Sequence, residues 1–161
     1  MNEVMIKMVE NPEFLSDVAV NSREEAINLC LDKISDLTQE AVLAINFDAE
    51  FVPINCCLVS MGTVDQSICR PADFWKSAIL SNAKYTICAH NHPVPGSLNP
   101  SPSDLKLSRD LAMAGWHIGI TLLDFLIVQD STYVSFMDSC PEYVNMRLIM
   151  GEDNDEHGED H

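Results

Sequence analysis

The sequence predicts one domain of the α/β or α+β class, in which helices sandwich a β-sheet. Helical and strand-like segments interleave along the 161 residues, and two of the strand-like segments are adjacent, as in a hairpin. The composition agrees, because 47% of the residues are hydrophobic, whereas a disordered polyelectrolyte has too few apolar residues to build a core. The length also suits one domain of ordinary size.

The N-terminal part predicts a helix followed by a hairpin. A capping box, SREE at 22–25, begins a helix over 22–37, because its serine hydroxyl and glutamate carboxylate satisfy amides that are free at a helix start. Apolar residues then recur at three- and four-residue spacing and form one stripe. We expect a strand over 40–47, a turn at 48–50 and a second strand over 51–59 that pairs with the first.

The middle of the chain predicts a helix and a central strand. Pro71 suits the first position of a helix that ends near Asn82, since the missing amide of proline would have no partner there. Residues 85–89 are apolar and β-prone, and they run directly into the sequence HNH at 90–92.

The last third predicts another helix and more strands. Ser101 suits the N-cap of a third helix, which we expect Gly115 to close. Residues 117–136 are predicted to form strands that are broken near 123–124 and turned at 129–131.

Four regions are predicted along the chain. They are an N-terminal extension over 1–21, a folded domain over 22–138, a C-terminal extension over 139–150 and a disordered acidic tail over 151–161. The tail holds six acidic residues and no basic one.

The charge balance excludes some classes of partner. The chain has 25 acidic and 9 basic residues, so its net charge is −16, and residues 1–150 alone carry 9 − 19 = −10. A surface that binds nucleic acid needs basic side chains to neutralise phosphates, so we expect no direct binding of nucleic acid. A basic protein or peptide is the partner that this acidic body favours.

Cysteine usage and hydropathy predict the compartment. The six cysteines form no CxxC pair and most lie in apolar runs, which favours buried free thiols. The N-terminus has acids where a signal peptide needs apolar residues, and no segment approaches the roughly 18 apolar residues of a membrane span. We therefore expect a soluble protein of the reducing cytoplasm, with no indication of its oligomeric state.

Two histidines at the end of the predicted central strand indicate a metal site. Side chains alternate along an extended chain, so His90 and His92 project to the same side with Cα atoms about 6.5–7 Å apart. A catalytic zinc ion uses three protein ligands and one water molecule. Asp104, in the first turn of the next helix, is the natural third ligand, because the intervening loop can fold the helix start over the strand end.

Two further residues are candidates for catalysis. Activation of a metal-bound water needs a carboxylate that is not itself a ligand, and Glu40 is a candidate, although spacing alone does not select it over other acids. Ser101 is a candidate donor to the oxyanion that forms when water attacks a carbonyl. Each has a structural alternative, since Glu40 suits a surface acid at a strand start and Ser101 suits a helix N-cap.

The pattern H-x-H followed by S-x-x-D, with a glutamate upstream, resembles the JAMM signature of JAB/MPN metalloproteins. The stretch from about 37 to 138 is similar to the RadC-type branch in particular. The resembling segments are FD at 47–48, SMGT at 60–63, RPADF at 70–74, AHNHP at 89–93, NPSPSD at 99–104, LLD at 122–124 and YVS at 133–135.

The resemblance implies a JAB fold, with a curved mixed β-sheet flanked by helices and a zinc site at a strand end. It places His90, His92 and Asp104 on the metal, Glu40 in the place of the general acid/base and Ser101 beside the oxyanion. Characterised JAB relatives are zinc-dependent peptidases that often cleave isopeptide bonds. The RadC-type branch has no settled substrate, and its DNA-repair label is an association rather than a mechanism.

The chain departs from the family pattern in three places. The loop between the second histidine and the serine is one residue longer than usual, around 94–95. Arg70 and Phe125 stand where this branch often has histidine, and we expect them to alter a substrate groove. The stretch ahead of residue 22 is too short for the helix-hairpin-helix module of longer relatives, so we expect a short form without that DNA-binding element.

The leading hypothesis is a zinc metallohydrolase, a peptidase or isopeptidase that uses a zinc-activated water to attack an amide carbonyl. The alternative is a non-catalytic, metal-binding interaction module of the same fold, with a link to DNA repair or mobile-element biology. The letters HNH would also fit a nuclease of the ββα-metal type. The position of the motif before S-x-x-D and the shortage of phosphate-neutralising charge argue against that class.

Overall fold

The computed structural model describes residues 21–62, 69–93, 98–130 and 132–140, together with Met5, Met8 and Val9. The elements, in chain order, are α1 (Arg23–Ile34), β1 (Glu40–Phe47), β2 (Pro53–Gly62), α2 (Pro71–Leu80), β3 (Tyr85–Asn91), α3 (Pro102–His117), β4 (Thr121–Gln129), β5 (Thr132–Ser135) and α4 (Phe136–Ser139). The predicted acidic tail, the lengthened loop at 94–95 and nearly all of the two predicted extensions lie outside the described residues.

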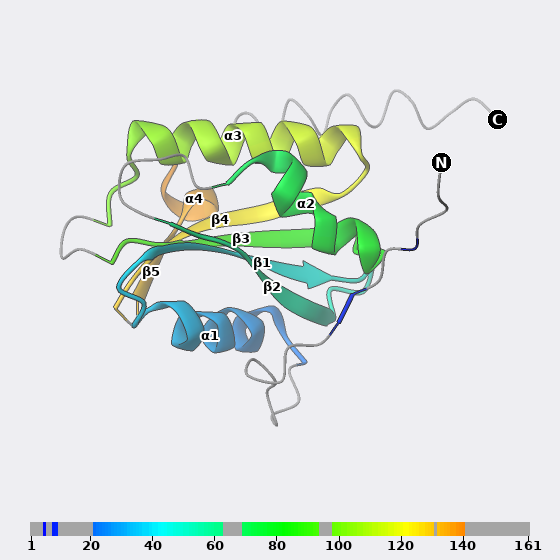
Figure 1. Ribbon diagram of the computed structural model, residues 1–161, viewed down its shortest axis with the longest axis horizontal. Coiled ribbons are helices and arrows are strands. Elements are labelled where there is room, and N and C mark those ends of the chain that lie inside the picture. The colour runs from blue at the N-terminus through cyan, green and yellow to red at the C-terminus, as the bar shows by residue number, and fades with distance from the viewer. Residues whose placement is uncertain are drawn as a thin grey trace.

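The five strands form one mixed sheet in the order β2-β1-β3-β4-β5. β3 and β4 run parallel, and the other neighbouring strands run antiparallel. Figure 1 shows α1 against one face of the sheet and α2 and α3 over the other. The predicted α+β class, with a mixed sheet flanked by helices, is confirmed.

Helices on both faces bury β1 along nearly its whole length. Leu43 and Ile45 belong to the core on the α1 side, whereas Val42 and Ala44 belong to the core on the α2–α3 side. Because side chains alternate along a strand, Glu40 stands on the α2–α3 side with Val42. The strand that begins with the candidate base is therefore held firmly by two layers of packing.

The edge strand β2 begins later than predicted, at Pro53, and ends at Gly62. The reason lies in the preceding turn, where the Asp48 carboxylate accepts hydrogen bonds from the N–H groups of Glu50 and Val52 at 3.0 and 2.8 Å. These bonds keep residues up to Val52 in the turn. Helices α1 and α2 end three and two residues earlier than predicted, because the ends of a helix are the part that local sequence specifies least.

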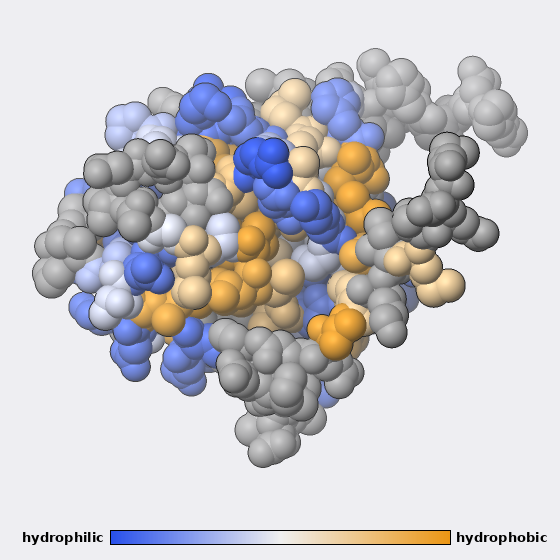
Figure 2. Space-filling view, viewed as in Figure 1, coloured by the Kyte–Doolittle hydropathy of each residue, from blue (hydrophilic) through white to orange (hydrophobic). Residues whose placement is uncertain are grey.

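Several exposed hydrophobic side chains lie just before and within the start of β2, namely Phe51, Val52 and Ile54. Figure 2 shows apolar side chains gathered in the middle of one face of the molecule, with hydrophilic side chains above and below them.

Of the six cysteines, Cys69 and Cys88 are buried as predicted, whereas the other three with described side chains are partly exposed.

The prediction that Gly115 closes α3 is wrong. The helix continues to His117, and Gly119, with a φ of 74°, takes the left-handed conformation beyond its end. Gly115 is buried, and a Cβ atom there would stand 2.5 Å from the carbonyl oxygen of Ile120 and would collide with the Trp75 ring. Its small size lets α3 approach α2 and the start of β4.

The predicted break near 123–124 is a β-bulge within one continuous strand. Thr86 and Ile87 of β3 pair with Leu122 and Asp124 of β4, which leaves Leu123 as the extra residue. The bulge shifts the alternation of side chains between the two faces of the sheet, but the strand continues beyond it. The turn predicted after this strand is confirmed, because β4 ends and β5 begins on either side of it.

Candidate metal centre

The predicted metal ligands come from the end of β3 and the start of α3. His90 lies inside β3, opposite Val42 of β1, so the strand continues into the HNH sequence. His92 follows the strand, and its N–H donates a hydrogen bond of 2.8 Å to the carbonyl of Val128 on β4. Asp104 lies in the first turn of α3. The end of β3 and the start of α3 therefore meet at one end of the sheet.

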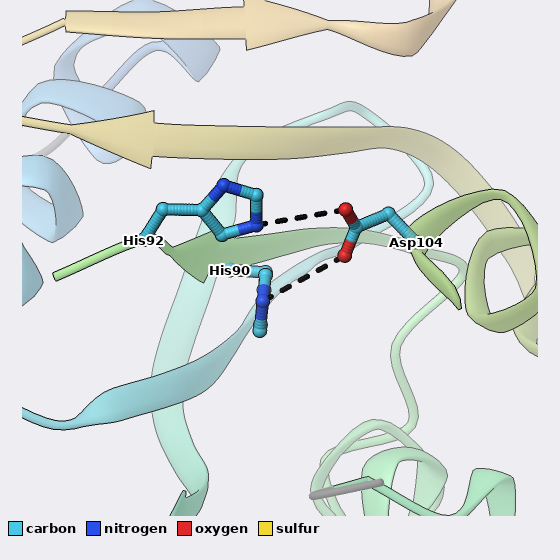
Figure 3. Close-up of side chains that lie close together, drawn as sticks. All are labelled: His90, His92 and Asp104. Atoms are coloured by element: carbon cyan, nitrogen blue, oxygen red, sulfur yellow. Dashed lines mark ion pairs between the residues drawn. The ribbon is translucent and has the colours of Figure 1, made fainter. Parts of the chain in front are cut away.

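The three side chains converge on one point. His90 Nε2 is 3.7 Å from Asp104 Oδ1, and His92 Nε2 is 3.5 Å from Asp104 Oδ2. One ligand atom from each residue lies within 4.8 Å of the others. Figure 3 shows the two imidazoles on one side of a small space and the Asp104 carboxylate on the other, with one oxygen directed at each ring.

The cluster has the dimensions of a site for a single cation. Atoms that bind zinc at about 2.0–2.2 Å stand about 3.3–3.6 Å from one another in a tetrahedral shell. The observed separations of 3.7 and 3.5 Å join the two histidines to different oxygens of Asp104, and one ligand atom from each of the three residues lies within 4.8 Å of the others. Both distances are longer than an ordinary hydrogen bond between an imidazole and a carboxylate. The residues predicted to share a metal are thus brought together in a suitable geometry.

Asp104 uses its two oxygens differently. Oδ2 accepts hydrogen bonds from the Ser101 N–H at 2.8 Å and from the Ser101 hydroxyl at 2.6 Å. Burial alone would raise the pKa of Asp104, but the neighbouring His92 and Ser101 side chains outweigh it and lower the pKa to about 2. The carboxylate is therefore ionised at neutral pH, and Oδ1, which faces His90, remains an anionic oxygen suited to a cation.

His90 has the protonation state that a metal ligand needs. Burial lowers its pKa to about 4, against the opposite effect of the Asp104 charge. The ring is consequently neutral near pH 7, with a lone pair available for a metal ion. Its Nδ1 atom is buried and has no hydrogen-bond partner within the described part of the chain, so packing must hold the ring in place.

Phe125 supplies part of that packing. It is fully buried on β4, and its ring centroid lies 6.5 Å from that of His90 and 4.8 Å from that of Phe136. The expectation that Phe125 alters a substrate groove is therefore wrong, because a fully buried ring lines no groove.

Arg70 is exposed just before α2, and its guanidinium pairs with Asp73 at 2.6 Å.

Glu40 lies at the same end of the sheet. It is half-buried at the start of β1 and pairs with Gly62 of β2. Burial raises the pKa of Glu40, while the nearby His92 lowers it and the Asp104 charge raises it. Val42, two residues after Glu40, pairs with His90, so Glu40 begins β1 at the end of the sheet where the cluster lies, without being one of the three converging groups.

Ser101 is the N-cap of α3, as the sequence predicts. Its hydroxyl accepts from the Asp104 N–H at 3.2 Å and caps α3, and the Asp104 carboxylate accepts from the Ser101 N–H in return. The Ser101 hydroxyl also lies 2.8 Å from the Ser103 hydroxyl. The role of Ser101 beside an oxyanion stays a prediction, as do the zinc-binding roles of the three ligands and the base role of Glu40.

Among the residues that the structure describes, none of the helices combines the length and the apolar character needed to cross a bilayer.

Comparison with known proteins identifies the family. A model of the RadC-like JAB domain matches residues 20–141. A UPF0758 protein of Shouchella clausii is 33% identical over 119 residues, which are 74% of this chain and 51% of the relative. The UPF0758 protein YsxA of Bacillus subtilis is 34% identical over 119 residues, with the same shares of 74% and 51%. The chain thus spans about half the length of the curated relatives that it matches. Together with the mixed sheet and the His-His-Asp cluster, these matches show that the chain belongs to the RadC-like JAB domain family.

Proposed function

We propose that this chain is a zinc-dependent hydrolase that cleaves an amide bond in a protein or peptide, as a peptidase or isopeptidase. The observation that carries the proposal is the convergence of His90, His92 and Asp104 at one end of the sheet, with one carboxylate oxygen facing His90. Three protein ligands leave one position of a tetrahedral shell open, which distinguishes catalytic zinc sites from structural ones.

A zinc ion at this site would lower the pKa of a water molecule to about 7 and polarise a carbonyl group. Glu40 supplies the proton acceptor. Glu40 begins β1, in which Val42 pairs with His90. Burial raises the pKa of Glu40, which is the direction that favours a general base. Glu40 would take a proton from the attacking water and later deliver it to the leaving amine.

Ser101 supplies a hydrogen-bond donor beside the reacting carbonyl. Its hydroxyl donates to Asp104 Oδ2 at 2.6 Å, so it must turn away from that oxygen to reach an oxyanion. A rotation of the O–H bond alone would redirect this donor, while the Ser101 oxygen still accepts from the Asp104 N–H and the Asp104 carboxylate still accepts from the Ser101 N–H. The helix start would then stay capped while the hydroxyl donates to the oxyanion.

The charge of the chain favours a basic substrate. Residues 1–150 carry a net charge of −10, and a field of this sign raises the local concentration of cationic peptides. Nucleic acid would be repelled by the same field.

The experiment compares hydrolysis of lysine-rich peptides and of isopeptide-linked peptides by the zinc-loaded protein and by its Glu40→Gln variant. We expect kcat to fall about 10²- to 10⁴-fold in the variant, with zinc content unchanged. Glu50→Gln, at an exposed turn position, is the matched control and should keep full activity. Hydrolysis that is unaffected by Glu40→Gln would contradict the proposal.

One observation favours a second candidate, a non-catalytic metal-binding interaction module. The Ser101 hydroxyl is engaged with Asp104 and with the Ser103 hydroxyl, as in a purely structural helix cap. Turnover of a peptide that disappears in His92→Ala would exclude this candidate, whereas a zinc-loaded protein that binds peptides without cleaving them would support it.

A further inference from the structure

Asn91 lies between the two candidate histidine ligands, but its side chain contacts β1. The side chain is buried, with 1% of the residue exposed. Its Oδ1 atom accepts a hydrogen bond of 2.5 Å from the Ala41 N–H, and its Nδ2 group donates one of 3.1 Å to the Gln39 carbonyl. Neither bond belongs to the regular pairing of the sheet.

These two bonds extend the sheet beyond the point where the backbone of β3 leaves β1. The following residue, His92, directs its N–H to Val128 of β4, so the backbone there follows β4. The Ala41 N–H and the Gln39 carbonyl project from the same edge of an extended strand, toward β3. The primary amide of Asn91 therefore takes the place of a backbone peptide group, with one acceptor and one donor.

These two bonds constrain the backbone of Glu40. The Gln39 carbonyl and the Ala41 N–H belong to the two peptide bonds that flank the Glu40 Cα atom, so one amide holds both of them. On the other side, Glu40 pairs with Gly62 of β2. The backbone of Glu40 is thus fixed from both sides, and on one side it is fixed by the residue that joins His90 to His92.

We infer that Asn91 is a positioning residue that holds Glu40 in register with the two histidines. This inference rests on the proposed function, in which Glu40 is the base. Only a primary amide of this length satisfies both backbone groups, since an aspartate offers no donor when ionised and an alanine offers neither group. The shared support keeps the base and the metal ligands at a constant separation, which matters because a displacement of about 1 Å at an active site can cost about 100-fold in rate.

The first arm of the test measures the strand start directly in zinc-free protein. We expect amide hydrogen exchange at Ala41 to accelerate at least tenfold in Asn91→Ala, because that N–H loses its acceptor. Asn46→Ala is the matched control. Like Asn91, Asn46 is a buried asparagine whose side chain makes hydrogen bonds, here to Asn55 and Ser77. It lies in β1, about 20 Å from Glu40 along the strand.

The second arm measures activity and asks whether Asn91 acts through Glu40. We expect Asn91→Ala to lower kcat about 10- to 100-fold, with KM and zinc content near those of the wild type, whereas Asn46→Ala keeps the wild-type kcat. In a Glu40→Gln background, Asn91→Ala should cause no further loss, because the group that it positions is already gone. A residue with only a structural role would lower kcat equally in both backgrounds.

The outcomes separate this inference from the proposed function. If the wild type hydrolyses no peptide, the proposed function fails, and exchange at Ala41 alone decides whether Asn91 holds the strand start. If the wild type is active, unchanged exchange at Ala41, an unchanged kcat, or a kcat loss matched by zinc loss overturns the inference. If Asn91→Ala does not fold, Asn91→Ser, which keeps a small polar group, is measured in its place against the same criteria.

Discussion

At the scale of single residues, Asp104 links the helix cap to the candidate metal centre. Oδ2 is held by Ser101, while Oδ1 faces His90. A carboxylate that is fixed by hydrogen bonds presents its other oxygen in one orientation, which is the usual task of groups that surround a metal ligand. Ser101 should therefore affect the metal as well as the helix.

Ser101→Ala separates these two effects when it is compared with Ser22→Ala. Ser22 caps α1 through the Glu25 N–H, so each variant should lose about 1 kcal/mol of unfolding free energy. Only Ser101→Ala should also weaken zinc binding, by about 10- to 100-fold. Urea unfolding of the zinc-free proteins and zinc titration against a chelator measure the two quantities. Equal zinc affinities would show that the cap does not orient the ligand.

The sequence predicted the three residues of the candidate metal centre but not the residues that support them. His90, His92 and Asp104 were predictable because their spacing follows from strand alternation and a helix start. The contacts of Asn91 depend on the pairing of β1 with β3, which local sequence does not specify. In the sequence Asn91 is only the middle letter of HNH, and the burial of Phe125 beside His90 likewise depends on tertiary packing.

At the scale of elements, α3 carries Asp104, so its packing positions the candidate centre. Gly115 allows the close approach of α3 to Trp75, whose Nε1–H donates to the Leu111 carbonyl at 3.2 Å. Trp75 is 2% exposed, so its ring has little room to move. Added volume at Gly115 must therefore displace the helix.

Two glycines near the end of α3 should respond differently to substitution. Gly115→Ala should lower the unfolding free energy by about 1–3 kcal/mol through overpacking. Gly119→Ala, in open space but with a φ of 74°, should cost roughly 1–2 kcal/mol through backbone strain. Asparagine tolerates the left-handed conformation, so Gly119→Asn should be milder than Gly119→Ala, and Gly115→Asn should be worse than Gly115→Ala. Urea unfolding checks this order, and a milder Gly115→Asn would contradict the packing account.

Most elements were predicted because their signals are local. The strand Glu40–Phe47 was predicted residue for residue, and the Ser22 and Ser101 caps are both observed. The errors arose where tertiary contacts decide. Gly115 resembles a helix end because its packing against Trp75 is not encoded in the local sequence, and the β-bulge at Leu123 resembles a strand break for the same reason.

At the scale of the whole molecule, the acidic surplus sets the expected response to salt. Residues 1–150 carry a net charge of −10. Between about 0.01 M and about 0.1 M ionic strength the Debye length falls from about 30 Å to about 10 Å. We expect KM for a lysine-rich peptide to rise several-fold over this range, while KM for a neutral peptide of equal length stays constant. The opposite order would remove the argument for a basic substrate.

The proposed site, in which His90, His92 and Asp104 hold one zinc ion, can be tested by measuring the zinc content of the purified protein. Elemental analysis would compare the wild type with His90→Ala and with His117→Ala, a variant of an exposed histidine on α3. We expect one zinc ion per chain in the wild type and in His117→Ala, and far less in His90→Ala. A wild type that holds no zinc, or a His90→Ala variant that holds as much as the wild type, would contradict it.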